Sequence, residues 1–141
     1  MEHVGIVVDD LAAALAFFED LGMTSQGDSS SVEGDWVDRI VGIDDIRADV
    51  AFLETPDGGG RIELIKFNAP PTPDGSGNEP ANLPGLRHLA FRVDDIEDTV
   101  ARLQAHGAEL VGEVADFGTV FRLCYLRGPA GMVVELAQAI A

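Results

Sequence analysis

The chain is poor in cysteine, in basic residues and in long apolar runs. Cys124 is the only cysteine among 141 residues, so no disulfide can form within the chain, which favours a reducing cytoplasm. The chain has 9 basic and 25 acidic side chains, and a net charge of −16 disfavours binding to a phosphate backbone. No apolar run approaches the roughly 18 residues of a membrane span, and the first residues lack the basic and apolar parts of a signal peptide. We therefore expect a cytoplasmic protein that binds a small-molecule substrate, with no nucleic acid and no membrane as partner.

The sequence repeats itself at an offset of 85 residues. Residues 3–22 read HVGIVVDDLAAALAFFEDLG, and residues 88–107 read HLAFRVDDIEDTVARLQAHG, with six of twenty positions identical in register. Unrelated segments would share about one position in twenty, so the chain contains two copies of one module.

Each copy begins with the pattern of a strand followed by a helix. Residues 4–8 and 89–93 are short, apolar and rich in β-branched side chains, which predicts strands. An Asp pair follows each strand and can cap a helix, and apolar residues then recur at helical spacing from Leu11 and from Ile96.

Three further strands are expected in each half, so each half reads βαβββ and the fold class is α+β. The clearer ones are residues 48–54, 61–67, 109–114, 121–127 and 132–137, whereas a strand within 24–32 is weakly marked and 36–43 is either a short helix or a loop. The modules are expected to span 1–67 and 85–141 within a single domain, 1–141. Residues 68–84 contain five prolines and two glycines and predict a linker, with a lid over a site as the alternative.

Four polar residues occupy matching places in the two copies. Glu63 and Glu135 each interrupt an apolar strand that follows a Pro/Gly turn, and His3 and His88 open the first strand of each module. A single such glutamate could simply face water, but burial without a partner, a proton or a metal is costly. The symmetry favours a joint role, because two imidazoles and two carboxylates suit one divalent ion such as Ni, Co, Zn, Mn or Fe.

The order of these motifs resembles the vicinal oxygen chelate superfamily, which includes glyoxalase I, methylmalonyl-CoA epimerase, extradiol dioxygenases and bleomycin-resistance proteins. The resemblance rests on HVGIVVDD at residues 3–10, GLRHLAFRVDDI at 85–96 and GMVVEL at 131–136, and it covers nearly the whole chain. It implies two modules whose mixed sheets curve into a cup around a divalent metal. The positions of His3, Glu63, His88 and Glu135 match the four ligand positions of that family.

The resemblance to glyoxalase I implies a metal-dependent lyase or isomerase. Such an enzyme moves a proton alpha to a carbonyl through a metal-bound enediolate. In that branch a ligand glutamate can leave the metal and take the proton, which makes Glu135 the first candidate base and Glu63 its partner. Small members of the family usually dimerise, so a homodimer is expected.

Three alternatives stay open, because a fold does not determine a function. The segments around His88 also resemble methylmalonyl-CoA epimerase, although that branch often has Gln where this chain has Glu63. An Fe(II) extradiol-type dioxygenase uses two histidines and one carboxylate, and Glu63 would crowd its open positions. An antibiotic-sequestering resistance protein needs no metal, and the full ligand set argues against it.

Strand alternation adds candidate substrate-binding residues. Residues two apart share a face, so Arg92 lies on the face of His88 and Arg61 on the face of Glu63. Both could bind an anionic tail of the substrate, or could instead pair with some of the many acidic residues. Trp36 and Phe52 could line an apolar pocket, although Trp36 could equally belong to the core.

Overall fold

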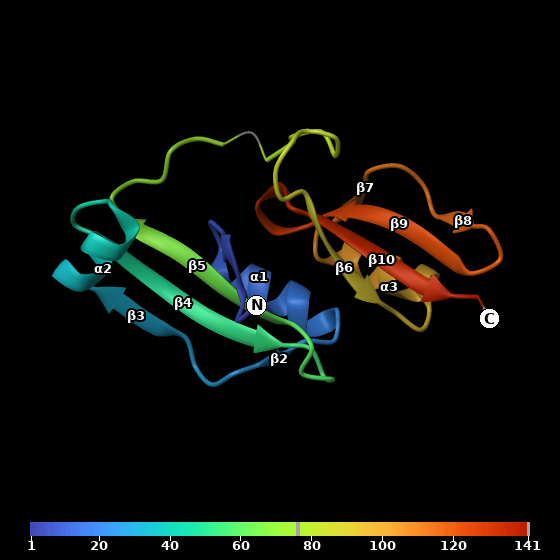
Figure 1. Cartoon of the computed structure of the whole chain (residues 1–141), viewed down its shortest axis with the longest axis horizontal. Helices are drawn as coiled ribbons and strands as arrows, with labels where there is room; N and C mark the ends of the chain where they lie inside the picture. Colours follow the sequence, from blue (N-terminus) through green and yellow to red (C-terminus); the bar gives the residue numbers. More distant parts are fainter. Residues whose placement is uncertain (76, 141) are drawn as a thin grey trace. The chain divides into compact units, whose positions relative to one another are not determined.

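The protein was analysed as a computed structural model, which describes residues 1–75 and 77–140. The chain divides into two compact units, Met1–Gly75 and Ser76–Ala141, and each contains a five-stranded mixed sheet (Figure 1). The α+β class and the two repeated modules expected from the sequence are confirmed. None of the helices in the described residues has the length and the apolar character that a membrane crossing requires.

The first unit follows the βαβββ plan with one added helix and with two short strands, β2 and β3, in place of the second strand, both paired with β4. Its sheet has the order β1-β5-β4-β2, with β3 also paired to β4, and β1 and β5 run parallel. The elements are β1 (Val4–Val7), α1 (Leu11–Asp20), β2 (Thr24–Ser25), β3 (Ser30–Glu33), α2 (Asp35–Val41), β4 (Arg47–Glu54) and β5 (Arg61–Ala69).

The second unit repeats this plan. Its sheet has the order β6-β10-β9-β7, with β8 also paired to β9, and β6 and β10 run parallel. The elements are β6 (His88–Arg92), α3 (Ile96–Ala105), β7 (Glu109–Leu110), β8 (Ala115–Phe117), β9 (Phe121–Arg127), the 3₁₀ turn η1 (Pro129–Gly131) and β10 (Val133–Ala139).

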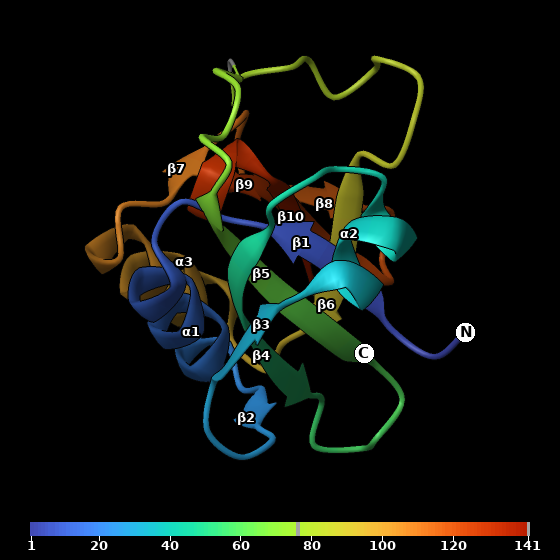
Figure 2. The ribbon, with the colours of Figure 1, turned by 90° about the vertical axis from the view of Figure 1, so that its left-hand side faces the viewer.

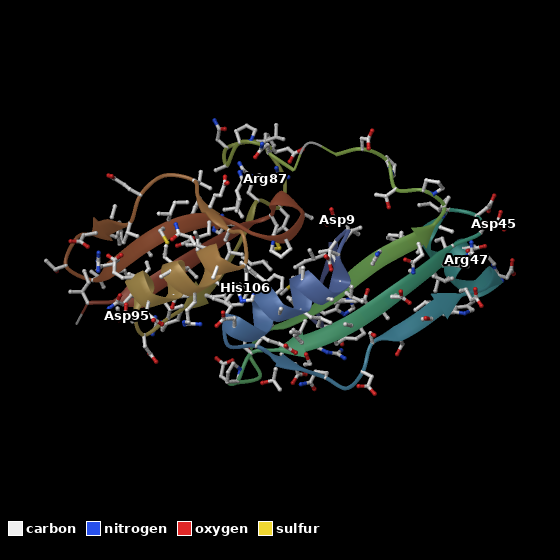
Figure 3. All side chains as sticks on the ribbon, turned by 180° about the vertical axis from the view of Figure 1, so that it is seen from behind. Asp9, Asp45, Arg47, Arg87, Asp95 and His106 are labelled. Carbon is white, nitrogen blue, oxygen red and sulfur yellow. The ribbon has the colours of Figure 1, made fainter. Side chains whose placement is uncertain are left out.

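The predicted helix caps are present in both units. The carboxylate of Asp10 accepts the backbone N–H of Ala13 at 3.0 Å, and that of Asp95 accepts the N–H of Asp98 at the same distance. Each bond satisfies a donor that has no partner within the helix. Figure 3 shows Asp95 at the start of α3 and His106 at its end.

In each unit one helix packs on one face of the sheet (Figure 2). In the first unit Phe17 and Phe18 of α1 are buried together with Leu64 of β5. In the second unit Leu103 of α3 and Leu136 of β10 are fully buried. Burial of each such side chain is worth about 1.5–3 kcal/mol, so the apolar alternation of the strands determines which face packs against the helix.

The structure corrects the prediction for one segment and decides between helix and loop for another. Residues 109–114 do not form one strand, because pairing with β9 stops after Leu110 and resumes only at Ala115. Gly112 lies in the interruption, and glycine weakens a strand by its conformational freedom. Most of the ambiguous residues 36–43 belong to helix α2, which is capped at its C-terminus by Gly42 in the left-handed conformation.

Candidate metal centre

The second unit brings His88 and Glu135 together on the open face of its sheet. His88 begins β6 beside Val133 of β10, and Glu135 lies two residues further along β10, beside Ala90. The His88 Nε2 and the Glu135 Oε2 are 3.0 Å apart. Both side chains are only partly exposed, 37% for His88 and 19% for Glu135, so they keep a route to a ligand.

The first unit repeats this arrangement with His3 and Glu63. His3 directly precedes β1, and Glu63 lies beside Gly5 across the parallel β1–β5 pair. The His3 Nε2 and the Glu63 Oε2 are 3.9 Å apart. The two units thus present the same imidazole–carboxylate pair at equivalent places in equivalent sheets.

The neighbours of each glutamate are also equivalent. On the parallel side stand small residues, Gly5 beside Glu63 and Ala90 beside Glu135, which leave room next to the carboxylates. On the antiparallel side stand aromatic rings. Phe52 meets the His3 ring edge-on at 5.5 Å between centroids, and Tyr125 lies 5.0 Å from the His88 ring. These rings restrict the orientation of the two imidazoles.

A carboxylate from outside the strands orients His3. Glu2 accepts a hydrogen bond from the His3 Nδ1, and it also pairs with Arg61. The bond from His3, followed by the charges of His3 and Arg61, lowers the pKa of Glu2 below its ordinary value. We assign the His3 proton to Nδ1 on the basis of this bond, which leaves the lone pair of Nε2 free to bind a metal, as in many metal-binding histidines.

The arginines expected to bind a substrate tail have other contacts within their units. Arg61 pairs with Glu2, lies 3.8 Å from Glu54, and stacks over the Phe52 ring at 4.1 Å. Arg92 lies 5.4 Å from the centroid of the Phe121 ring. The contacts of Arg61 favour the ion-pair alternative for that residue.

The two aromatic candidates differ in their relation to His3. Phe52 contacts its ring directly. Trp36 lies on α2 with 58% of its surface exposed, and in the described part of the chain no hydrogen bond or ring contact joins it to His3. The structure therefore places Phe52 beside the candidate ligands and Trp36 on the surface of the first unit.

The spacing of the His88–Glu135 pair matches that of two ligands on one divalent metal, whereas the atoms of the His3–Glu63 pair are 3.9 Å apart. Two neighbouring ligands with bonds of about 2.1 Å to one ion lie about 3 Å apart, which is the separation found between His88 and Glu135. Nitrogen and carboxylate oxygen together suit Zn, Ni, Co, Mn or Fe. Across residues 1–75 and 77–140, no three histidine, cysteine, aspartate or glutamate side chains gather into one cluster.

Two cavities are lined by residues other than these pairs. The larger, about 630 Å³, lies in the first unit between α2 and β4, and Asp38 on its wall accepts the backbone N–H groups of Asp45 and Ile46. This carboxylate therefore stabilises the loop before β4, near the labelled Asp45 and Arg47 of Figure 3.

The second cavity, about 140 Å³, lies in the second unit and is lined by Arg87 and Arg127. The sequence analysis did not single out Arg87, Arg127, Glu2 or Tyr125, because their contacts depend on which segments become lateral neighbours. Alternation along β9 puts Tyr125 and Arg127 on one face, and this was the one available signal for those two residues.

Comparison with known proteins gives one consistent family. The model of the Glyoxalase/Bleomycin resistance protein/Dioxygenase superfamily matches residues 2–125. The uncharacterized protein YaeR of Escherichia coli is 33% identical, over 98% of this chain and 95% of its own. A glyoxalase family protein from Bacillus cereus has a crystal structure with a TM-score of 0.94 and 42% identity, covering 100% of this chain and 94% of its own.

More distant structures share the fold alone. A mutant of the fosfomycin resistance protein FosX from Listeria monocytogenes, complexed with Mn(II) and 1S,2S-dihydroxypropylphosphonic acid, has a TM-score of 0.61 and 15% identity. The match covers 99% of this chain and 89% of that one.

Proposed function

The chain belongs to the glyoxalase/bleomycin resistance protein/dioxygenase superfamily, and on this premise we propose that it is a divalent-metal-dependent enzyme that transfers a proton alpha to a carbonyl. The observation that supports the proposal most is the imidazole–carboxylate pair on the open face of each sheet, with 3.0 Å between His88 and Glu135. A purely structural ion pair would not need to recur at the equivalent place in the other unit.

The ligand set of the proposal is His3, Glu63, His88 and Glu135. Catalytic zinc sites use three protein ligands, so one pair is too few and both pairs are needed for one ion. The two pairs could come from one chain, or one from each chain of a homodimer. The FosX complex contains Mn(II), which supports trying Mn as well as Ni, Co, Zn and Fe.

A bound ion would supply Lewis-acid polarisation of two adjacent substrate oxygens. The residues of the chain would do the rest. Glu135 is proposed as the base, because it lies in the middle of β10 with only Ala90 beside it on the parallel side. His88 would bind the ion through its Nε2 next to Glu135, and Glu63 would serve as the second proton carrier beside Gly5.

Turnover of the hemithioacetal of methylglyoxal and glutathione tests the proposal. Protein loaded with each of the five ions should form thioester, detected by its absorbance, and Glu135→Gln should lower kcat by about 10²–10⁴-fold. Glu54→Gln removes the same charge from a strand of the first unit and should leave kcat within about twofold.

A second assay covers the epimerase-like alternative. If no thioester forms, the protein is incubated with a methylmalonyl thioester in D₂O. Deuterium at the alpha carbon would support the proposed proton transfer with this substrate in place of the hemithioacetal. Absence of both reactions with all five ions would refute the enzyme proposal and favour a binding protein.

A further inference from the structure

The cavity of about 140 Å³ in the second unit has an unusual lining for so acidic a protein. Arg87 and Arg127 both line it, together with Glu79, Leu86 and the turn at Gly131. Figure 3 shows Arg87 where the chain enters β6. Since one water molecule occupies about 30 Å³ of liquid, the cavity has the size of one small polar group and not of a whole drug-sized ligand.

Arg127 is fixed in place with spare donors. Its Nη1 donates to the carbonyl of Gly131 at 3.0 Å, and its Nη2 donates to the carbonyl of Glu79 at 2.6 Å. A guanidinium has five N–H donors, so three are left after these bonds. Two neutral carbonyls position the group without neutralising its charge.

Arg87 has a buried donor with no partner. Its Nε is inaccessible to solvent and makes no hydrogen bond to any described residue. A buried donor left in this state is destabilising, because it has lost its hydrogen bonds to water. Such a cost is recovered when a ligand supplies the acceptor.

Some arginines of the chain have a carboxylate partner. Arg61, Arg102 and Arg122 each have a carboxylate within 4 Å. For Arg87 and Arg127, no ion pair with a carboxylate is found among residues 1–75 and 77–140. Two guanidinium groups therefore line this cavity with one acidic residue, Glu79, in a chain that has 25 acidic side chains.

The cavity adjoins the candidate metal ligand of the same unit. Val133 lines it and is the β10 residue paired with His88. Arg87 precedes His88 in the chain. A group bound between the two arginines would therefore belong to a molecule whose remainder extends toward His88.

We propose that Arg87 and Arg127 form a subsite for an oxyanion group of the substrate, either a carboxylate or a phosphate. Planar guanidinium groups bind both groups through paired N–H···O bonds. The inference rests on the proposed function, because it specifies the substrate of that site as an anion held beside His88. The segment that contributes Glu79 forms one wall of the subsite.

Binding of inorganic phosphate and of acetate to metal-free protein tests the subsite. Protein treated with EDTA and dialysed is titrated at constant ionic strength, and the arginine Nε–Hε signals are followed by NMR. We expect saturable shifts of the Arg87 signal with at least one of the two anions. The anion that binds more tightly identifies the class.

Two variants of equal charge complete the test. Arg87→Gln removes a side chain for which no hydrogen bond is found within residues 1–75 and 77–140, and it should weaken binding of the anion about tenfold or more. Arg102→Gln removes the same charge from α3 and should stay within about twofold of wild type. Equal affinity in wild type and Arg87→Gln, or no binding of either anion, would overturn the subsite.

Metal loading of the same protein separates the two proposals. Anion binding without metal binding would support the anion subsite and refute the proposal of a metal-dependent enzyme. Metal binding and turnover without anion binding would support the metal-dependent enzyme and refute the anion subsite.

Discussion

The contact between Glu2 and His3 leads to a prediction that a general charge effect cannot reproduce. Glu2 accepts the Nδ1 proton of His3, and this bond directs Nε2 toward Glu63. Loss of such an outer partner typically lowers metal affinity 10–100-fold, which corresponds to about 1.4–2.8 kcal/mol at 1.4 kcal/mol per tenfold change. We expect Glu2→Gln to weaken metal binding by this amount without abolishing it.

Glu54→Gln is the matched control. Glu54 and Glu2 both lie near Arg61, but Glu54 is 3.8 Å away from it and makes no bond to His3. Both variants remove one negative charge, so an effect of net charge on a cation would be similar in the two. The Glu54 variant should keep its metal affinity within about twofold.

The assay is a competition titration with a chromophoric chelator, with Co(II) and Zn(II) at fixed pH. Glu2 is exposed and its pKa is lowered, so it stays ionised at neutral pH in the folded protein. The reasoning would be refuted if both variants lost affinity equally, or if Glu2→Gln bound metal as tightly as wild type.

Three further predictions concern the framework. Gly131→Ala should destabilise the protein by about 1–3 kcal/mol in urea unfolding, because φ of Gly131 is +74° and a Cβ would overlap the Gly77 carbonyl. Gly112→Ala is the control and should cost under about 0.5 kcal/mol, because a Cβ there would have no atom within 4 Å. Equal costs for the two variants would contradict the close contact between Gly131 and Gly77. Burial raises the pKa of Cys124 from 9.0 to about 11, so at pH 8 the thiol of the folded protein should react with a disulfide reagent about 100-fold more slowly than the thiol of protein unfolded in urea. The free energy of unfolding should fall as the pH rises from about 9 to 11, because the thiol of the unfolded chain ionises first. A fast reaction of the folded protein would show that the thiol is accessible to the reagent. Leu136→Ala should cost about 2–5 kcal/mol, measured as a lower urea midpoint at constant slope; a cost under 1 kcal/mol would mean that the helix-facing layer is loosely packed.

Much of this fold could be predicted because each module repeats a local pattern. The Asp caps, the helical spacing after Leu11 and Ile96, and the period-two strands all concern neighbours in sequence. Alternation also places Glu135 and His88 on the face away from the helix, in agreement with the structure. What it leaves open is the lateral neighbour of each residue, since that depends on strand order and register.

The missed contacts are lateral ones. Tyr125 meets His88 only because β9 and β6 both flank β10. Arg127 meets Glu79 only because the segment before β6 lies against the η1 turn. Weak β-propensity also limits prediction, as in residues 109–114, where Gly112 and the short β7 interrupt a segment that is apolar enough to suggest one strand.

The central claim is that the two imidazole–carboxylate pairs bind one divalent ion together, and metal stoichiometry tests it most directly. Metal-free protein is reloaded with each of the five ions, dialysed and analysed by mass spectrometry for metal per chain, alongside His3→Ala and His88→Ala. The account predicts one ion per chain for at least one metal in the wild type, and loss of that ion in both variants, one from each unit. Metal retained at full occupancy in either variant, or no ion bound by the wild type, would contradict it.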